Sequence, residues 1–463
     1  METARTVRTA GLVRTSGTAR TTGRGRPADR SRTAGRVRPP EMASRVRESF
    51  SASTERMGQA ARSGALTRMG GARNGAVDAR RMDNNKTKYH AKKETYVDYS
   101  MVFVVLFLLV FGLVMLYSTS SYDGRLKYDD SAYYLKHQLL PTGLGIGLMM
   151  VVSRIPYHFY KKVSTLAYVF AITMILLVKS PLGMEINNAR RWIKIFGVSI
   201  QPAEAAKLAM IVVLASFISK LGKGILNPRA FWVVMGIPIP VCLLVWRVTK
   251  NLSTAIIIFG IAFLMLFVAT PGYRKFIAIV AAGFAAAAGV VALVVRAGYH
   301  SEMNFRFGRI LAWLDPEAYV NDKGYQTLQS LYAIGSGGLF GKGLGESMQK
   351  LGFIPEAQND MIFSIICEEL GIVGAIAVMI MFIILIYRMM VIAQNAPDMY
   401  GALLVIGVLA HISLQVILNI AVVTNTIPNT GITLPFISYG GTAVLFLLTE
   451  IGIVFNVARH IEM

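Results

Sequence analysis

Long uninterrupted apolar blocks fill this sequence after Asp98, and they constrain the fold more than any other feature. A helix that crosses a membrane needs roughly 20 apolar residues, and about ten stretches of about that length occur. Hydrophobic residues make up 54% of the chain and charged residues 16%, which is far from the soluble average. The sequence therefore predicts an all-α, polytopic membrane protein with about ten transmembrane helices. The predicted spans begin near Met101, Gln138, Thr165, Ala205, Phe231, Leu252, Phe276, Met361, Ala402 and Thr442.

The first 95 residues differ in kind, because Arg, Thr, Gly, Ala and Ser dominate and no apolar segment occurs. Residues 1–95 hold 22 Lys and Arg against 8 Asp and Glu, and so carry +14 of the formal charge of +22. Such a segment buries too little surface to offset its ordering entropy, so we expect a basic, disordered cytoplasmic tail. It is interpreted either as a tether to anionic lipid or a partner, or as a solvated tail that obeys the positive-inside rule. An organellar transit peptide is a third interpretation.

The charges between the apolar blocks indicate the topology. Lys and Arg gather in alternate loops, among them "SRIPYHFYKK" and "SKLGKGILNPRA", which the positive-inside rule places in the cytoplasm together with the basic tail. An even number of spans then returns the C-terminus to the cytoplasm. The sequence thus predicts that both termini are cytoplasmic.

Two loops on the outer side break this pattern. The first lies between the third and fourth spans and carries Arg190, Arg191 and Lys194, on the side where cations are usually sparse. We expect an anionic group to bind there. The second runs from about residue 297 to residue 360, and loops of that length are usually functional or disordered. Its many aromatic and aliphatic residues predict a large, ordered extracytoplasmic loop.

Glu204 and Lys207 lie three residues apart at the start of the fourth span, hence on one helix face and close enough to pair. A plain helix start, with Pro202 early and an acidic residue near the positive end of the dipole, explains Glu204 but not a lysine deeper in the span. Ionisable groups at that depth usually face a bundle interior or a watered cavity. We therefore favour a cavity pair.

Two stretches are rich in Gly or Pro, one within the large outer loop and one at the edge of the last span. "GSGGLFGKGLG", residues 335–345, fails the Walker spacing, because Ser336 replaces the first Gly and Gly343 replaces the final Ser or Thr. A flexible turn or a substrate-lining loop is expected instead. "TNTIPNTGITLPFISYGGT", residues 424–442, predicts irregular backbone at membrane depth, which persists only against protein or a watered cavity. It is either re-entrant packing or a wall of the cavity.

Four carboxylates lie in "FIPEAQNDMIFSIICEELG", residues 353–371, at the start of the eighth span. Asp360 immediately precedes the apolar run, so a helix N-cap is the plain interpretation. Glu356 is harder to explain by capping. Two carboxylates at the outer surface, near unexpected cations, suit a reaction that removes a proton and stabilises an anionic leaving group. Glu368 and Glu369 need partners inside the span, either in packing or in the cavity.

Three long motifs resemble those of the SEDS proteins, the FtsW, RodA and SpoVE group of bacterial cell-wall polymerases. They are "NNARRWIKIFGVSIQPAEAAKLAMI", "RILAWLDPEAYVNDKGYQTLQSLYAIGSGGLFGKGLGESMQKLGFIPEAQNDMIFSIICEELG" and "PNTGITLPFISYGGT". The likeness spans about Asp98 to the C-terminus, so residues 96–463 are expected to form the transmembrane glycosyltransferase domain. The second motif looks more like the FtsW and SpoVE branch than RodA.

The resemblance implies a peptidoglycan glycosyltransferase of the bacterial cytoplasmic membrane, which polymerises lipid II into glycan strands for septal cell-wall synthesis. It implies a class B penicillin-binding protein as partner, together with membrane proteins of the divisome and membrane lipids, and no nucleic acid. The family's essential aspartate falls on Asp360, and its membrane Glu and Lys fall on Glu204 and Lys207. Its arginine–tryptophan motif falls on Arg191 and Trp192.

The implied mechanism makes Asp360 the general base on the 4-hydroxyl of the acceptor sugar, which attacks the donor's anomeric carbon with inversion and displaces a lipid pyrophosphate. No ligand cluster in the sequence requires a metal, although Mg²⁺ or Mn²⁺ is compatible with that leaving group. The candidate substrate-binding residues are Glu204, Lys207, Arg191, Glu356 and Ser438.

One position departs from the family pattern. Where many members have Pro-Asp-Leu-Gly-Thr-Ala, residues 250–255 are Lys-Asn-Leu-Ser-Thr-Ala, without the carboxylate. Two other function classes stay open. Spans with ionisable residues also suit a lipid II flippase that carries the lipid-linked precursor through an alternating-access cavity. A non-catalytic membrane scaffold is the third candidate.

Overall fold

The computed structural model describes residues 98–186, 189–195, 198–297, 305–321 and 324–461. The basic tail predicted for residues 1–95 lies outside these described residues. Within them, ten helical segments are long and apolar enough to cross a membrane. The predicted all-α, polytopic class is therefore confirmed.

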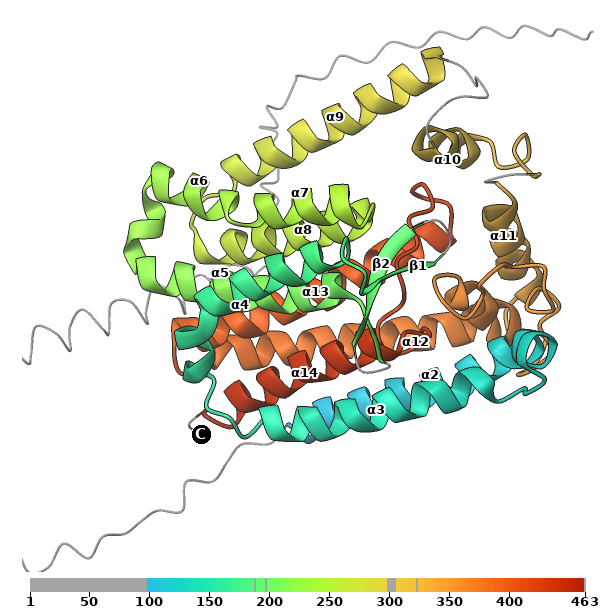
Figure 1. Ribbon diagram of the computed structural model, residues 1–463, viewed down its shortest axis with the longest axis horizontal. Helices are drawn as coiled ribbons and strands as arrows, with labels where there is room; N and C mark the ends of the chain where they lie inside the picture. Colours follow the sequence, from blue (N-terminus) through green and yellow to red (C-terminus); the bar gives the residue numbers. More distant parts are fainter. Residues whose placement is uncertain (1–97, 187–188, 196–197, 298–304, 322–323, 462–463) are drawn as a thin grey trace, which may run out of the picture. The chain divides into compact units, whose positions relative to one another are not determined.

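The ten spans contain α2 (Tyr99–Tyr128), α3 (Tyr133–Val152), α4 (His158–Leu177), α5 (Pro202–Leu221), α6 (Pro228–Gly236) with α7 (Pro238–Val248), α8 (Leu252–Ala269), α9 (Arg274–Ala297), α12 (Ile362–Gln394), α13 (Met399–Val423) and α14 (Gly441–Ala458) (Figure 1). A short 3₁₀ turn, Gly222–Leu226, follows α5. The largest difference from the predicted starts is at α4, which begins at His158 rather than near Thr165. The fifth span consists of two helices, because Pro238 lacks the backbone donor that a continuous helix would need there.

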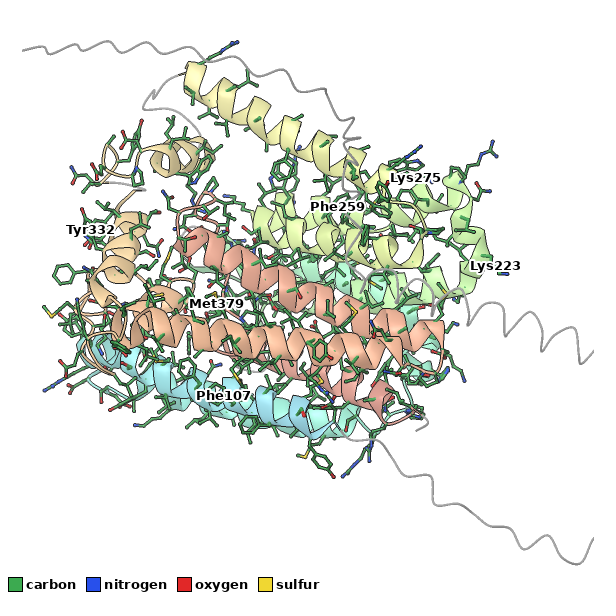
Figure 2. The ribbon with its side chains drawn as sticks, turned by 180° about the vertical axis from the view of Figure 1, so that it is seen from behind. Phe107, Lys223, Phe259, Lys275, Tyr332 and Met379 are labelled. Carbon is green, nitrogen blue, oxygen red and sulfur yellow. The ribbon has the colours of Figure 1, made fainter. Side chains whose placement is uncertain are left out.

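Helix α13 is the central element of the packing, since it contacts α5, α8, α12 and α14. Buried residues make up 72% of its apolar stretch and 78% of that of α14, but only 6% of that of α9. Apolar side chains also cover the outer faces of other helices, as Phe107 does on α2, where it is 40% exposed (Figure 2). Exposed apolar surface of this extent is expected where lipid, rather than water, surrounds the helices.

The loop between α4 and α5 contains a small sheet that the sequence did not predict. Strands β1 (Gly183–Ile186), β2 (Ala189–Ile195) and β3 (Val198–Ile200) pair antiparallel in the order β1-β2-β3. The pairing of β1 with β2 is irregular between Met184 and Glu185. Ile193 is buried against Met174 and Val178, which anchors the sheet to the end of α4.

The large loop between α9 and α12 is ordered over its described residues, as predicted. It contains α10 (Phe305–Leu314) and α11 (Tyr325–Gly337), and α11 packs on α12. The backbone N–H groups of Lys342 and Gly343 donate to the carbonyls of Glu368 and Glu369, at 2.9 and 3.0 Å. Helix α12 is interrupted just beyond, at Gly371, whose φ is 68°. The glycine-rich stretch therefore packs its backbone against the backbone of α12 near the break in that helix, and it is not a phosphate loop.

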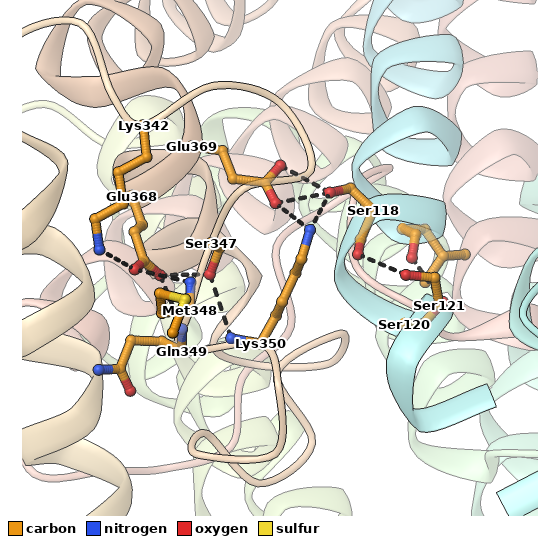
Figure 3. A network of polar contacts seen from close by, with 11 residues as sticks. Ser118, Ser120, Ser121, Lys342, Ser347, Met348, Gln349, Lys350, Glu368 and Glu369 are labelled. Atoms are coloured by element: carbon orange, nitrogen blue, oxygen red, sulfur yellow. Dashed lines mark hydrogen bonds and ion pairs between the residues drawn. The ribbon is translucent and has the colours of Figure 1, made fainter. Parts of the chain in front are cut away.

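Glu368 fastens the chain that follows α11 (Figure 3). Its carboxylate accepts a hydrogen bond from Lys342 Nζ at 2.6 Å and another from the Ser347 hydroxyl. The backbone N–H groups of Met348 and Gln349 donate to the same carboxylate at 3.2 and 3.3 Å. One buried acid thus orders a whole turn of the loop between α11 and α12.

Glu369 joins this turn to α2 (Figure 3). Its carboxylate pairs with Lys350 Nζ at 2.7 Å and accepts from the Ser118 hydroxyl at 2.7 Å. Lys350 Nζ also donates to Ser118 Oγ at 3.1 Å. Of the two alternatives for Glu368 and Glu369, the structure supports packing rather than the cavity.

Candidate functional site

Asp360 lies in the turn before α12, next to the N-terminal end of that helix. The N-cap of α12 is Met361, without a capping side chain, so the interpretation of Asp360 as a helix cap is wrong. Its carboxylate faces Gly431, because a Cβ placed on that glycine would lie 3.5 Å from Asp360 Oδ2. Its backbone carbonyl accepts a hydrogen bond from Asn419 Nδ2 at 2.8 Å. Asp360 is therefore held between α13 and the chain that follows α13.

Burial raises the pKa of Asp360 to about 6, even though the residue keeps some exposed surface. Its own backbone N–H lowers the pKa, the Glu356 carboxylate raises it, and the Arg309 guanidinium lowers it. Glu356 itself is exposed and accepts a hydrogen bond from Asn359 Nδ2 at 2.9 Å. With a pKa of about 6, Asp360 is mostly deprotonated at pH 7 and still a competent proton acceptor.

The chain between α13 and α14, residues 424–440, forms a wall beside Asp360. Side chains of α10, α11 and α8 hydrogen-bond to this wall and hold it in place. Arg309 Nη1, on α10, donates to the carbonyl of Asn429 at 3.2 Å. Gln326 Oε1, on α11, accepts from Asn429 Nδ2 at 2.8 Å. Ser253 Oγ, on α8, donates to the carbonyl of Thr430 at 2.9 Å. These hydrogen bonds satisfy polar groups of the irregular segment, residues 424–442, that the sequence predicted.

Glu204 and Lys207 pair as predicted, with Lys207 Nζ 2.9 Å from Glu204 Oε2. The two side chains are only 9% and 2% exposed. Lys207 Nζ also donates to Gln415 Oε1 on α13, at 3.1 Å. The lysine charge is thus balanced by Glu204 and enclosed between α5 and α13.

Three polar side chains on α13 were missed by the sequence reasoning. His411, Gln415 and Asn419 follow one another at intervals of four residues, so they lie on one face of an otherwise apolar helix. Gln415 Nε2 donates to the wall, at the carbonyl of Thr433, at 3.0 Å. The signal was present in "HISLQVILN", where polar residues recur with the period of a helix.

Arg309 was also missed as an individual residue, although it lies within a motif that drew attention for other reasons. Its guanidinium acts on Asp360 from α10, which is distant from α12 in sequence. Periodicity within one segment cannot reveal such a pair.

Arg191 and Ser438 have contacts of their own. Arg191 Nε donates to the carbonyl of Thr249 at 3.3 Å, which places it beside the start of α8. There Asn251 caps α8, since its side chain accepts from Thr254 N at 3.1 Å. Ser438 is buried, and its hydroxyl accepts from Leu434 N at 2.8 Å. Direct substrate contacts by Arg191, Glu356 and Ser438 stay predictions.

Metal ligands do not gather in the part of the chain that the structure describes. No group of three or more His, Cys, Asp or Glu side chains there could hold a metal ion. Cys242 and Cys367 are free thiols, partly and fully buried. The charges described around Asp360 are therefore those of Arg and Glu side chains.

Comparisons with known sequences identify the family of the chain. The FtsW/RodA/SpoVE family model, described as cell cycle protein, matches residues 99–463. Stage V sporulation protein E of Bacillus subtilis (strain 168) is 40% identical over 370 residues, which are 80% of this chain and 98% of the relative. A probable peptidoglycan glycosyltransferase FtsW of Trichlorobacter lovleyi is 35% identical over 367 residues, covering 79% of this chain and 94% of the relative.

Two solved structures share the fold. One comes from work on structural coordination of polymerization and crosslinking by a peptidoglycan synthase complex. It has 25% sequence identity and a TM-score of 0.65, and it covers 78% of this chain and 97% of the other. The second is the rod shape determining protein RodA of Thermus thermophilus, with 24% identity, a TM-score of 0.57 and coverage of 79% and 98%. Since the family model matches the membrane part from end to end, the chain belongs to the FtsW/RodA/SpoVE family of cell cycle proteins.

Proposed function

We propose that this chain is a peptidoglycan glycosyltransferase that polymerises lipid II for septal cell-wall synthesis. The observation that carries the proposal is Asp360, a partly exposed acid with a pKa of about 6 at the outer end of a membrane helix. Relatives named probable peptidoglycan glycosyltransferase FtsW, 33 to 35% identical to this chain, support the activity.

In the proposed reaction, the Asp360 carboxylate accepts the proton of the acceptor's 4-hydroxyl while that oxygen attacks the anomeric carbon of the donor sugar. The bond from that carbon to the diphosphate breaks, and the configuration inverts. A base with a pKa near 6 suits this step, because it is deprotonated at neutral pH yet basic enough to accept a proton in the transition state.

The leaving diphosphate gains negative charge and needs cations nearby. We assign this role to Arg191 and Arg309, both of which are partly exposed. Lys207 is 2% exposed and already paired with Glu204, which supports a positioning role behind the site. Glu356, which is exposed, is assigned to binding of the acceptor, and the buried Ser438 to holding the backbone of the wall through Leu434.

The proposed location is the bacterial cytoplasmic membrane at the division septum, with both termini in the cytoplasm. An even number of spans supports placing both termini on the same side of the membrane. A class B penicillin-binding protein is the proposed partner, supported by the structural neighbour from a complex that coordinates polymerization with crosslinking. The 40% identity with stage V sporulation protein E favours sporulation as a second setting for the same chemistry. Depletion that blocks sporulation but spares septation would favour that setting.

The test uses the purified full chain in vesicles that contain lipid II, with and without its penicillin-binding partner. We compare wild type, Asp360→Asn and Glu346→Gln, where Glu346 is an exposed acid of the same outer loop. Glycan strands from wild type and Glu346→Gln, but not from Asp360→Asn, support the polymerase. Movement of lipid II between leaflets without strands overturns it in favour of a flippase. If the protein makes no strands and moves no lipid II, with or without its partner, the proposal is overturned in favour of a scaffold.

A further inference from the structure

We propose that Gln415 is a positioning residue, whose side-chain amide joins the buried Lys207 to the wall beside Asp360. The inference rests on the proposed function, since the groups it positions are those of the proposed reaction. Gln415 is 2% exposed and lies on α13, between the start of α5 and the wall. Its oxygen accepts from Lys207 Nζ at 3.1 Å, and its nitrogen donates to the Thr433 carbonyl at 3.0 Å.

These two partners fix which way the amide faces. The Lys207 ammonium can only donate, and the carbonyl oxygen of Thr433 can only accept. The opposite orientation of Gln415 would set donor against donor and acceptor against acceptor. The chemistry of the neighbours therefore determines the positions of the amide oxygen and nitrogen.

The amide orientation in turn fixes a proton on His411. Gln415 Oε1 only accepts, so His411 Nε2, at 2.9 Å, must carry a hydrogen. His411 Nδ1 faces Glu450 Oε2 at 2.7 Å, and one proton lies between them. Whichever of these two atoms holds that proton, His411 and Glu450 together carry no net charge.

Gln415 thus contacts two charge-balanced pairs, Glu204 with Lys207 and His411 with Glu450. Their side chains are 0 to 9% exposed. Buried ionisable groups are tolerated when each is paired and hydrogen-bonded. An amide between two such pairs adds hydrogen bonds without adding charge, which a carboxylate or an ammonium at this position would not do.

Asn419, one helical turn further along α13, extends the connection to Asp360. Its Nδ2 donates to the carbonyl of Asp360 at 2.8 Å and to that of Ile432 at 2.7 Å. Gln415 holds the next residue, Thr433, in the same manner. Two amides therefore attach adjacent wall residues to α13, close to the point where the wall faces the Asp360 carboxylate. A misplacement of about 1 Å at a reacting group can lower a rate by about 10²-fold.

The experiment compares Gln415→Leu with Asn456→Leu in the full chain, purified with its partner. Asn456 is a matched control, because it is a buried amide that bonds to the backbone of Tyr157 and Ser153, away from the wall. Gln415→Leu loses the hydrogen bonds to Lys207, His411 and Thr433, and Asn456→Leu loses those to Tyr157 and Ser153. We expect kcat for lipid II polymerisation to fall about 10- to 100-fold in Gln415→Leu, with KM nearly unchanged. Asn456→Leu should keep the wild-type kcat at a comparable melting temperature.

Gln415→Glu is the second variant, in case Gln415→Leu does not fold. It keeps an acceptor for Lys207 and His411, removes the donor to Thr433 and adds a charge between the two balanced pairs, so a loss of kcat at least as large is expected. A wild-type kcat in either folded variant overturns the inference, as does an equal loss in Asn456→Leu. Asp360→Asn, measured in parallel, separates the two levels of the account. If it is inactive while Gln415→Leu is fully active, only the inference fails, whereas an active Asp360→Asn removes the proposed function.

Discussion

Asn419 Nδ2 donates a hydrogen bond of 2.8 Å to the backbone carbonyl of Asp360, so a buried side chain of α13 holds the proposed base in place. Asn419 is fully buried, and Asp360 keeps some exposed surface. The hydrogen bond therefore connects the rigid interior of the bundle to the residue that must meet the substrate. A fixed base reacts faster than a mobile one, because its orientation is set before the substrate arrives.

The first prediction concerns this hydrogen bond. Asn419→Leu removes the donor to Asp360 and to Ile432, and leaves two carbonyls without that partner. We expect polymerisation to fall by about 10- to 100-fold, because the base is no longer held in place. The measurement is the steady-state rate with lipid II, compared with Asn456→Leu. Equal rates for the two variants would show that Asn419 matters only for stability.

The second prediction is a shift of the acid limb of the pH–rate profile. The Arg309 guanidinium lowers the pKa of Asp360 from the value that burial alone would give. Arg309→Gln should therefore raise that pKa, so that Asp360 becomes protonated and activity is lost at a higher pH than in wild type. The limb is read from kcat/KM, which reports the free enzyme. If the acid limb does not shift in Arg309→Gln, the protonation of Asp360 does not determine that limb.

The third prediction has the opposite sign. The Glu356 carboxylate raises the pKa of Asp360, so Glu356→Gln should lower it and extend activity to lower pH. Wild type should lose activity below about pH 6, the pKa of Asp360. The two variants thus bracket the wild-type profile. Shifts of both variants in the same direction would contradict the assignment of the limb to Asp360.

Apolar run length predicted most of the fold, since it requires no knowledge of tertiary contacts. The break of α12 at Gly371 escaped prediction because the run around it is continuous in sequence. The break depends on a tertiary contact, in which backbone N–H groups of the chain after α11 donate hydrogen bonds to carbonyls of α12. The small sheet between α4 and α5 was missed for a different reason. The basic residues of β2, among them the exposed Arg190 and Lys194, were interpreted as ligands and not as part of a strand.

The site was predicted in part. Glu204 with Lys207 followed from helix periodicity, and Asp360 followed from its position before an apolar run together with the family motif. The contacts of Arg309 with the wall and of Lys207 with Gln415 join segments more than 100 residues apart. Only the fold brings such residues together, so spacing along the sequence could not reveal them.

The fourth prediction tests the contact between the glycine-rich stretch and α12. Gly341 and Gly345 both have positive φ, 78° and 89°, so alanine at either position costs about 1–2 kcal/mol in backbone strain. At Gly341 the added Cβ would also lie 2.2 Å from the carbonyl oxygen of Glu369, whereas nothing lies within 4 Å at Gly345. Gly341→Ala should therefore lower the melting temperature clearly more than Gly345→Ala. Similar melting temperatures would contradict the close contact.

The central claim is that Asp360 is the general base of glycan polymerisation. Its most direct test is the rate at which purified Asp360→Asn polymerises lipid II, at equal protein concentration and with lipid II binding measured separately. Loss of a general base lowers a rate by about 10²- to 10⁴-fold, and a fall of that size with binding retained is the predicted result. Polymerisation by Asp360→Asn at the wild-type rate would contradict the account.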